Sequence, residues 1–193
     1  MLAAKGMALE VFHDACVVPP GQLTSGSGKQ YAVYSPWFRS WIAHIHGNLE
    51  LIELSDAPFK NPGSTRQALG RLFDVKIPGA PSGKGMTKEE ATRYRWLWPA
   101  GEHEAMKRLE TFCDEKVGQY AASRNIPGSN GTSSLSVHLA SGTLSARTAV
   151  RLARDMNRTK KLDGGSEGIQ TWISEVAWRD FYKHVLVNWP YVW

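Results

Sequence analysis

Residues 172–182 read Trp-Ile-Ser-Glu-Val-Ala-Trp-Arg-Asp-Phe-Tyr, and they lie within the longest helix that the sequence predicts, at about residues 167–187. A turn at Asp163-Gly164-Gly165 precedes this helix and Pro190 closes it. An α-helix turns once in about 3.6 residues, so residues three or four positions apart share a face. We expect one apolar face to point into the core: Ile169, Trp172, Ile173, Val176 and Val187.

A second face of the same helix carries a different set of side chains. Glu175, Trp178, Arg179 and Tyr182 follow one another at the i, i+3, i+4, i+7 spacing. A carboxylate, a flat ring, a forked cation and a phenol on one face suit a planar, hydrogen-bonding and partly anionic ligand. The alternative is a salt bridge between Glu175 and Arg179, beside aromatic rings that pack on a neighbouring helix. The spacing favours neither interpretation.

Upstream of this helix, residues 131–136 read Gly-Thr-Ser-Ser-Leu-Ser and precede another predicted helix. The first backbone N–H groups of a helix have no internal partner, and the helix dipole is positive at that end. Small hydroxylated side chains add donors and let an anion approach closely, so this stretch is a candidate phosphate cradle. Alternatively, Thr132 or Ser133 is only an N-cap, which is the commonest use of such residues.

We expect the rest of residues 101–193 to be helical as well. Apolar residues repeat at helical spacing across residues 102–116, a short helix runs through Tyr120, and another begins at Leu135. Ser145 is the expected N-cap of a further helix. All-α is therefore the predicted class of this half.

The first hundred residues give weaker patterns. Residues 10–18 (EVFHDACVV) form a short apolar run that predicts a buried strand, and Ser35-Pro36 predicts the start of a helix at residues 37–46. The core-facing residues of that helix are Phe38, Trp41, Ile42 and Ile45. From residue 47 to about residue 99, prolines and glycines interrupt every pattern, which indicates a long connection with short helical pieces.

Composition limits the class of protein. The 193 residues are 42% hydrophobic, enough for a core, and no apolar run approaches the ~20 residues that span a bilayer. Two cysteines are too few for a disulfide framework or a metal site. The net charge of +5 permits a polyanionic partner without requiring one. One predicted helix carries a basic stripe that either faces solvent or meets phosphates: Arg147, Arg151, Arg154 and Arg158.

Three segments together resemble the photolyase/cryptochrome family. The first is residues 19–38, with Pro-Pro-Gly at its start and Tyr-Ser-Pro-Trp-Phe at its end. The second is residues 120–136, in which Tyr-Ala-Ala-Ser-Arg is followed after seven residues by Thr-Ser-Ser-Leu-Ser. The third is residues 172–182. Their order and spacing carry the resemblance, which covers nearly the whole chain.

The resemblance implies a fold and a division into domains. The expected class is α+β, with residues 1–30 as the end of an α/β nucleotide-fold antenna domain. Residues 31–100 would form the interdomain linker with the first helices, and residues 101–193 the first part of an all-α FAD-binding domain. The family's later helices would then lie outside this chain, and we expect the chain alone to be inactive and poorly folded.

The resemblance also implies roles for individual residues. Arg124 would face a DNA phosphate, Glu175 would hydrogen-bond the base edges of a flipped pyrimidine dimer, and Trp178 would stack on that dimer. Glu175 and Trp178 are therefore the expected catalytic residues. The residues expected to bind FAD, with the diphosphate at 132–136, are Tyr120, Thr132, Ser133, Ser134, Leu135, Ser136, Trp172, Glu175, Arg179 and Tyr182.

The implied reaction is light-driven electron transfer from reduced FAD to a cyclobutane pyrimidine dimer in UV-damaged DNA, as in the class I dimer photolyases. Glu175 favours this subclass, because (6-4)-type enzymes and animal cryptochromes tend to carry Gln at that position. The alternative is a cryptochrome-type blue-light photoreceptor without repair activity. The family also uses an antenna chromophore, a folate or a deazaflavin, whose site would be largely absent here.

The opening residues lack the apolar middle of a secretory signal, so we expect an intracellular protein. The expected compartment is the nucleus or mitochondrion in a eukaryote and the cytoplasm in a bacterium. We expect a monomer that has no membrane partner.

Overall fold

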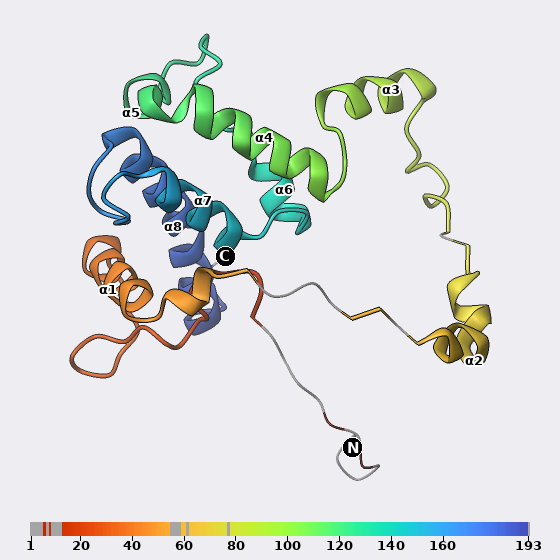
Figure 1. Cartoon of the computed structure of the whole chain (residues 1–193), viewed down its shortest axis with the longest axis horizontal. Coiled ribbons are helices and arrows are strands. Elements are labelled where there is room, and N and C mark those ends of the chain that lie inside the picture. The colour runs from red at the N-terminus through yellow and green to blue at the C-terminus, as the bar shows by residue number, and fades with distance from the viewer. Residues whose placement is uncertain are drawn as a thin grey trace. The chain divides into compact units, whose positions relative to one another are not determined.

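The structure, a computed structural model, describes residues 6, 8, 13–54, 59, 60, 62–76 and 78–192. Within these residues it is helical (Figure 1), and its only β-pairing is an isolated antiparallel bridge between Thr24 and Gln30. The expected helical character of the second half is confirmed. The α-helices are α1 (Tyr34–Gly47), α2 (Gly63–Phe73), α3 (Lys88–Leu97), α4 (Glu102–Glu115), α5 (Tyr120–Ser123), α6 (Ser136–Ser141), α7 (Ala146–Met156) and α8 (Glu167–Asn188). The described residues also form two 3-10 helices, η2 (Leu49–Ile52) and η3 (Val117–Gln119).

The chain divides into two units. The first consists of residues 1–53 and 101–193, and the second consists of residues 54–100. The second unit holds α2 and α3. Helix α3 begins with a capping box, in which the Thr87 hydroxyl accepts from the N–H of Glu90 and the Glu90 carboxylate accepts from the N–H of Thr87.

Helix α8 organises the first unit, where it contacts α1, α5, α7 and η3 (Figure 1). The predicted core face is confirmed for Ile169, Trp172, Ile173 and Val176, which are all buried. The prediction is wrong for Val187, which is 65% exposed. In the last turn of α8, Val185 still packs against the core, whereas Leu186 and Val187 are exposed.

Helix α1 begins at Tyr34, three residues before the start at residue 37 that the sequence predicts. Its N-cap is Val33, which makes no side-chain capping bond, so Ser35 is not the cap. Pro36 stands in the first turn, where a backbone N–H has no helical partner to lose. The early start has a physical reason in Tyr34, whose ring stacks on Trp178 of α8 with centroids 3.6 Å apart and planes 8° apart.

The expected strand at residues 10–18 is not formed in its described part. Residues 15–18 form bends, residues 13 and 14 have no regular structure, and residues 10–12 lie outside the described residues. Cys16, Val17 and Val18 are nevertheless buried, as the apolar run predicts. They are held by side chains of α8 instead of a neighbouring strand.

The turn before α8 depends on Asn157, the buried residue that ends α7. Its amide nitrogen donates to the carbonyl oxygens of Lys161 and Gly164, and its amide oxygen accepts from the N–H of Ser166. At the start of α7, the Ser145 hydroxyl accepts from the N–H of Arg147, which confirms the predicted cap. No described helix is long and apolar enough to cross a membrane.

Candidate functional site

A pocket of about 390 Å³ opens between α5, α6 and α8. Its lining combines two aromatic rings, two hydroxyls, a carboxylate and a guanidinium with short apolar side chains. The lining residues are Tyr120, Ser133, Leu135, Ser136, Leu139, Ala140, Trp172, Glu175, Val176 and Arg179. Seven of the ten residues expected to bind a cofactor thus lie together at one pocket, from segments about 50 residues apart in the chain.

The apolar wall of the pocket is a small aromatic cluster. Phe112 of α4 packs edge-on against Tyr120, with ring centroids 5.6 Å apart, and lies 5.4 Å from the ring of Trp172. Burial is the main cause that raises the pKa of Tyr120, while Arg124 opposes it. Tyr120 therefore stays a neutral phenol at neutral pH and offers a hydrogen bond without charge.

The carboxylate at the pocket belongs to a cross-helix ion pair. Glu175 Oε1 lies 2.6 Å from Nη1 of Arg124, and both side chains are partly exposed, at 37% and 28%. Arg124 also lies over the ring of Tyr120, with its Cζ 5.7 Å from the centroid. The alternative salt bridge from Glu175 to Arg179 is not formed, and Glu175 pairs instead with Arg124, the residue that follows α5.

Arg179 uses its guanidinium to join three parts of the chain. Nη1 donates to the carbonyl oxygen of Ala15 at 2.6 Å, and Nη2 donates to the carbonyl oxygen of Leu139 at 3.0 Å. Nη1 also lies 3.9 Å from Oδ1 of Asp180. One cation therefore fixes α6 and residue 15 against α8 at the rim of the pocket.

The other expected site residues lie outside the lining of this pocket. Trp178 stacks on Tyr34 and, with centroids 5.6 Å apart, on Tyr182, which is 58% exposed. Thr132 is exposed, and Ser134 has a positive φ of 51° that turns the backbone into α6. Of the second helix face, Glu175 and Arg179 therefore line the pocket, whereas Trp178 and Tyr182 do not.

The segment 131–136 does not cap a helix in the way that the sequence suggests. The N-cap of α6 is Leu135, and no side chain caps it, so neither Thr132 nor Ser133 has that role. Helix α6 has only six residues, which makes its dipole short. Ser133 and Ser136 are the hydroxyls that reach the pocket.

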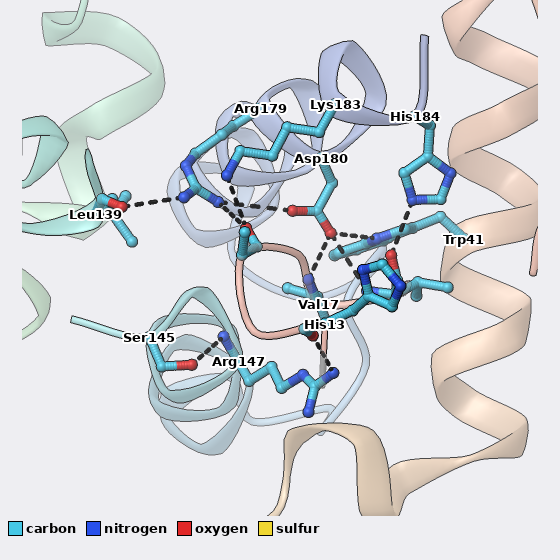
Figure 2. A network of polar contacts seen from close by, with 12 residues as sticks. His13, Val17, Trp41, Leu139, Ser145, Arg147, Arg179, Asp180, Lys183 and His184 are labelled. Carbon is cyan, nitrogen blue, oxygen red and sulfur yellow. Dashed lines mark hydrogen bonds and ion pairs between the residues drawn. The ribbon is translucent and has the colours of Figure 1, made fainter. Parts of the chain in front are cut away.

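Two polar residues that the sequence does not single out as candidates are buried on the core face of α8 (Figure 2). Asp180 is fully buried, and its Oδ2 accepts from the N–H groups of Val17 and Val18, at 2.7 and 3.3 Å, and from Nε1 of Trp41, at 3.2 Å. Its Oδ1 has no hydrogen-bond partner. Burial raises the pKa of Asp180 to about 6, against the lowering effect of the N–H groups that it accepts from and of Arg179.

His184, one turn further along α8, is the second of these residues. Its Nε2 donates to the carbonyl oxygen of Val18 at 2.8 Å, and its Nδ1 accepts from Nε1 of Trp37 at 3.4 Å. Burial lowers the pKa of His184, so the imidazole is neutral and both nitrogens are used. A sequence signal exists, because Val176, Asp180 and His184 follow at intervals of four on the core face.

The basic stripe of α7 is largely used within the chain. Arg147 donates to the carbonyl oxygen of His13, Arg151 lies 3.7 Å from Asp155, and Arg154 donates to the carbonyl oxygen of Lys160. These contacts favour the structural interpretation of the stripe over a phosphate-binding one. The described residues also contain no group of His, Cys, Asp and Glu arranged to hold a metal ion.

No protein-family model matches the chain. Among curated proteins, the deoxyribodipyrimidine photo-lyase of Neurospora crassa is 66% identical over 186 residues, which cover 96% of this chain and 30% of that protein. The chain belongs to the photolyase family. The mitochondrial deoxyribodipyrimidine photo-lyase of Saccharomyces cerevisiae is 31% identical to this photolyase-family chain, over 96% of the chain and 33% of the yeast protein.

A solved structure agrees with this assignment at the level of the fold. A bacterial class III photolyase from Agrobacterium tumefaciens matches with a TM-score of 0.66 and 24% identity, over 98% of this chain and 36% of that one. The photolyase-family chain spans about a third of the length of the relatives that it matches.

Proposed function

We propose that this chain is part of a deoxyribodipyrimidine photo-lyase that binds FAD and repairs cyclobutane pyrimidine dimers in DNA with light. The observation that carries the proposal is the pocket between α5, α6 and α8, whose lining includes seven of the ten residues expected to contact a flavin, in a chain 66% identical to the Neurospora enzyme. We further propose that the parent is of class I and that residues 1–30, 31–100 and 101–193 are its antenna-domain end, its linker and the start of its flavin domain.

The pocket is chemically suited to part of a flavin nucleotide. The rings of Tyr120 and Trp172 offer flat apolar contact, and the hydroxyls of Ser133 and Ser136 with the guanidinium of Arg179 offer donors to a phosphate or a ring carbonyl. A volume of about 390 Å³ lies at the low end of the range for drug-sized ligands, and FAD is larger than those. These side chains would thus hold a portion of the cofactor and leave the remainder outside this pocket.

When bound and reduced, FAD would supply the electron that splits the dimer. The residues of this chain would position the lesion beside it. Glu175 would accept hydrogen bonds from the bases, which requires its carboxylate to leave Arg124, and Arg124 would then be free to meet a DNA phosphate. Trp178, which stacks on Tyr34 and on Tyr182, would stack on the flipped dimer.

We also propose an intracellular monomer that acts on UV-damaged DNA, with an antenna folate or deazaflavin bound by the parent outside this chain. The name of the yeast relative places that protein in the mitochondrion. A nuclear or mitochondrial location would suit a eukaryotic source of this chain, and a cytoplasmic one would suit a bacterium.

A chimera tests the function directly. The 186 matched residues of the Neurospora photolyase are replaced by those of this chain, and the chimera is assayed for flavin absorbance and for light-dependent repair of a dimer-containing oligonucleotide. We expect a yellow, repair-competent protein. In this background Glu175→Ala should keep the flavin and lose most of the repair, on the order of tenfold or more, because the bases lose a charged acceptor.

The matched control is Glu167→Ala, which removes an exposed carboxylate from the same helix outside the pocket lining. It should leave repair unchanged. A colourless chimera would contradict the flavin proposal. A yellow chimera without repair would support the alternative, a cryptochrome-type photoreceptor.

A further inference from the structure

One buried oxygen atom of α8 accepts hydrogen bonds from the backbone of residues 17 and 18 (Figure 2). Three N–H groups converge on Oδ2 of Asp180, two from the backbone of Val17 and Val18 and one from the indole of Trp41, at distances of 2.7 to 3.3 Å. The Asp180 side chain is fully buried. A buried acceptor of this kind determines where the backbone that donates to it must lie.

The same segment also reaches the pocket. Two residues before Val17, the carbonyl oxygen of Ala15 accepts from Nη1 of Arg179 at 2.6 Å. Arg179 lines the pocket and uses its other terminal nitrogen on Leu139 of α6. Two adjacent residues of α8 therefore bind the same segment. The buried Asp180 carboxylate accepts from its N–H groups at residues 17 and 18, and Arg179, at the rim of the pocket, donates to its carbonyl oxygen at residue 15.

A guanidinium is planar, so two acceptors fix its position and one acceptor leaves it free to rotate. The position of Arg179 thus depends on the carbonyl of Ala15, which depends in turn on the docking of Val17 and Val18. We propose that Asp180 is a positioning residue of the pocket: by docking residues 15–18 on α8, it holds the Ala15 carbonyl where that oxygen orients Arg179. The inference that an oriented Arg179 helps to bind a flavin rests on the proposed function, whereas the docking of residues 15–18 on α8 does not.

Three other side chains also hold the same segment. Lys183 Nζ donates to the carbonyl oxygen of Ala15 at 3.2 Å, and Arg147 donates to that of His13 at 3.0 Å, both in exposed positions. His184 donates to the carbonyl oxygen of Val18 from the interior. All three are donors to carbonyl groups, so among the described side chains only Asp180 satisfies the N–H groups of Val17 and Val18.

The test compares Asp180→Ala with Asp180→Asn in this chain, at neutral pH and without flavin. The asparagine keeps an acceptor oxygen in the same place, whereas the alanine has none. We expect the amide protons of Val17 and Val18 to exchange about tenfold faster in Asp180→Ala than in the parent chain, because a buried hydrogen bond is lost. In ¹⁵N-arginine spectra, the Nη1 protons of Arg179 should be resolved in the parent and in Asp180→Asn, and averaged by rotation in Asp180→Ala.

A second variant tests the link through Ala15. A chain without residues 1–15 keeps Asp180, Val17 and Val18 but has no Ala15 carbonyl, and the Nη1 signals of Arg179 should average in it too. This variant decides the matter if Asp180→Ala does not fold. Resolved Nη1 signals in either variant would overturn the positioning role, as would fast exchange of Val17 and Val18 in Asp180→Asn. Both measurements work without a cofactor, so a failure to bind flavin would count against the proposed function alone.

Discussion

Asp180 makes the stability of the protein depend on pH in a direction that is unusual for a carboxyl group. Its pKa is about 6 in the folded chain, against 3.8 for an unburied aspartate, so between these pH values the folded state binds a proton that the unfolded state has released. Stability therefore falls as pH rises from about 4 to about 6. The difference in pKa corresponds to roughly 3 kcal/mol of unfolding free energy.

The variant Asp180→Asn isolates this effect, because it keeps the acceptor oxygen and removes the titration. We expect the unfolding free energy of Asp180→Asn, minus that of the parent chain, to rise between pH 4 and pH 6 and to be constant above pH 6.5. Denaturant titrations at intervals of half a pH unit measure this difference, in which the titrations of other groups cancel. A difference that stays constant across the range would show that Asp180 ionises at its ordinary pKa.

His184 acts in the opposite direction. Burial lowers its pKa below 6.5, so the unfolded state binds the proton first, and the stability due to neutral His184 is present above pH 6.5 and is lost as the pH falls. The same buried cluster thus contains Asp180, which stabilises the folded state more at low pH, and His184, which stabilises it more at high pH. The core-face spacing of Asp180 and His184 could have drawn attention to both, but their partners at residues 17 and 18 are more than 160 residues away in the chain, at no spacing that a sequence reveals.

At the level of the elements, the contact of α8 with η3 sets the position of the pocket wall. Gly168 stands in the first turn of α8, and a Cβ there would lie 1.9 Å from the carbonyl oxygen of Val117. That obstacle is backbone, which cannot rotate away as a side chain can. We expect Gly168→Ala to destabilise the fold by about 2 kcal/mol or more, because α8 must move away from η3.

The matched control is Gly164→Ala, four residues earlier, where the nearest atom to a new Cβ would be 3.6 Å away on the flexible side chain of Lys161. This variant should change the unfolding free energy by less than about 1 kcal/mol. Thermal or denaturant unfolding of the two variants checks the comparison. If both variants lose the same unfolding free energy, the close approach of α8 to Val117 is not the reason that residue 168 must be glycine.

Helix spacing predicts most of these elements, and each prediction that is wrong has a specific physical cause. Apolar residues at intervals of three and four identify α1, α4, α7 and α8, because each of these helices buries one face. The start of α1 is misplaced since stacking of Tyr34 on Trp178 outweighs the capping preference of Ser35. Residues 16–18 are buried like a strand, but the N–H groups of Val17 and Val18 bond to the side chain of Asp180 in α8, which an apolar run cannot distinguish from strand pairing.

For the whole molecule, the pocket is formed by packing between distant segments. The sequence indicates two separate groups of candidate site residues. One is Glu175 with Arg179 on a single helix face, and the other is the serines of residues 131–136. Their meeting at one pocket requires the short helix α6 to lie against α8, an arrangement held by the bond from Arg179 to the Leu139 carbonyl. The ion pair from Glu175 to Arg124 is likewise a contact between helices, so the intrahelical spacing of Glu175 and Arg179 pointed to the wrong partner.

The size of the pocket yields the last prediction, which concerns the chain as it stands. A volume of about 390 Å³ encloses only part of FAD, so much of the bound cofactor would stay in water and contribute little to affinity. We expect the purified 193-residue chain to be colourless and to bind added FAD with a dissociation constant no tighter than about micromolar. Absorbance of the purified chain and quenching of flavin fluorescence on titration measure both quantities, with Arg179→Ala as the variant that should weaken binding further. Recovery of a yellow protein with stoichiometric FAD would show that residues 1–193 enclose the cofactor on their own.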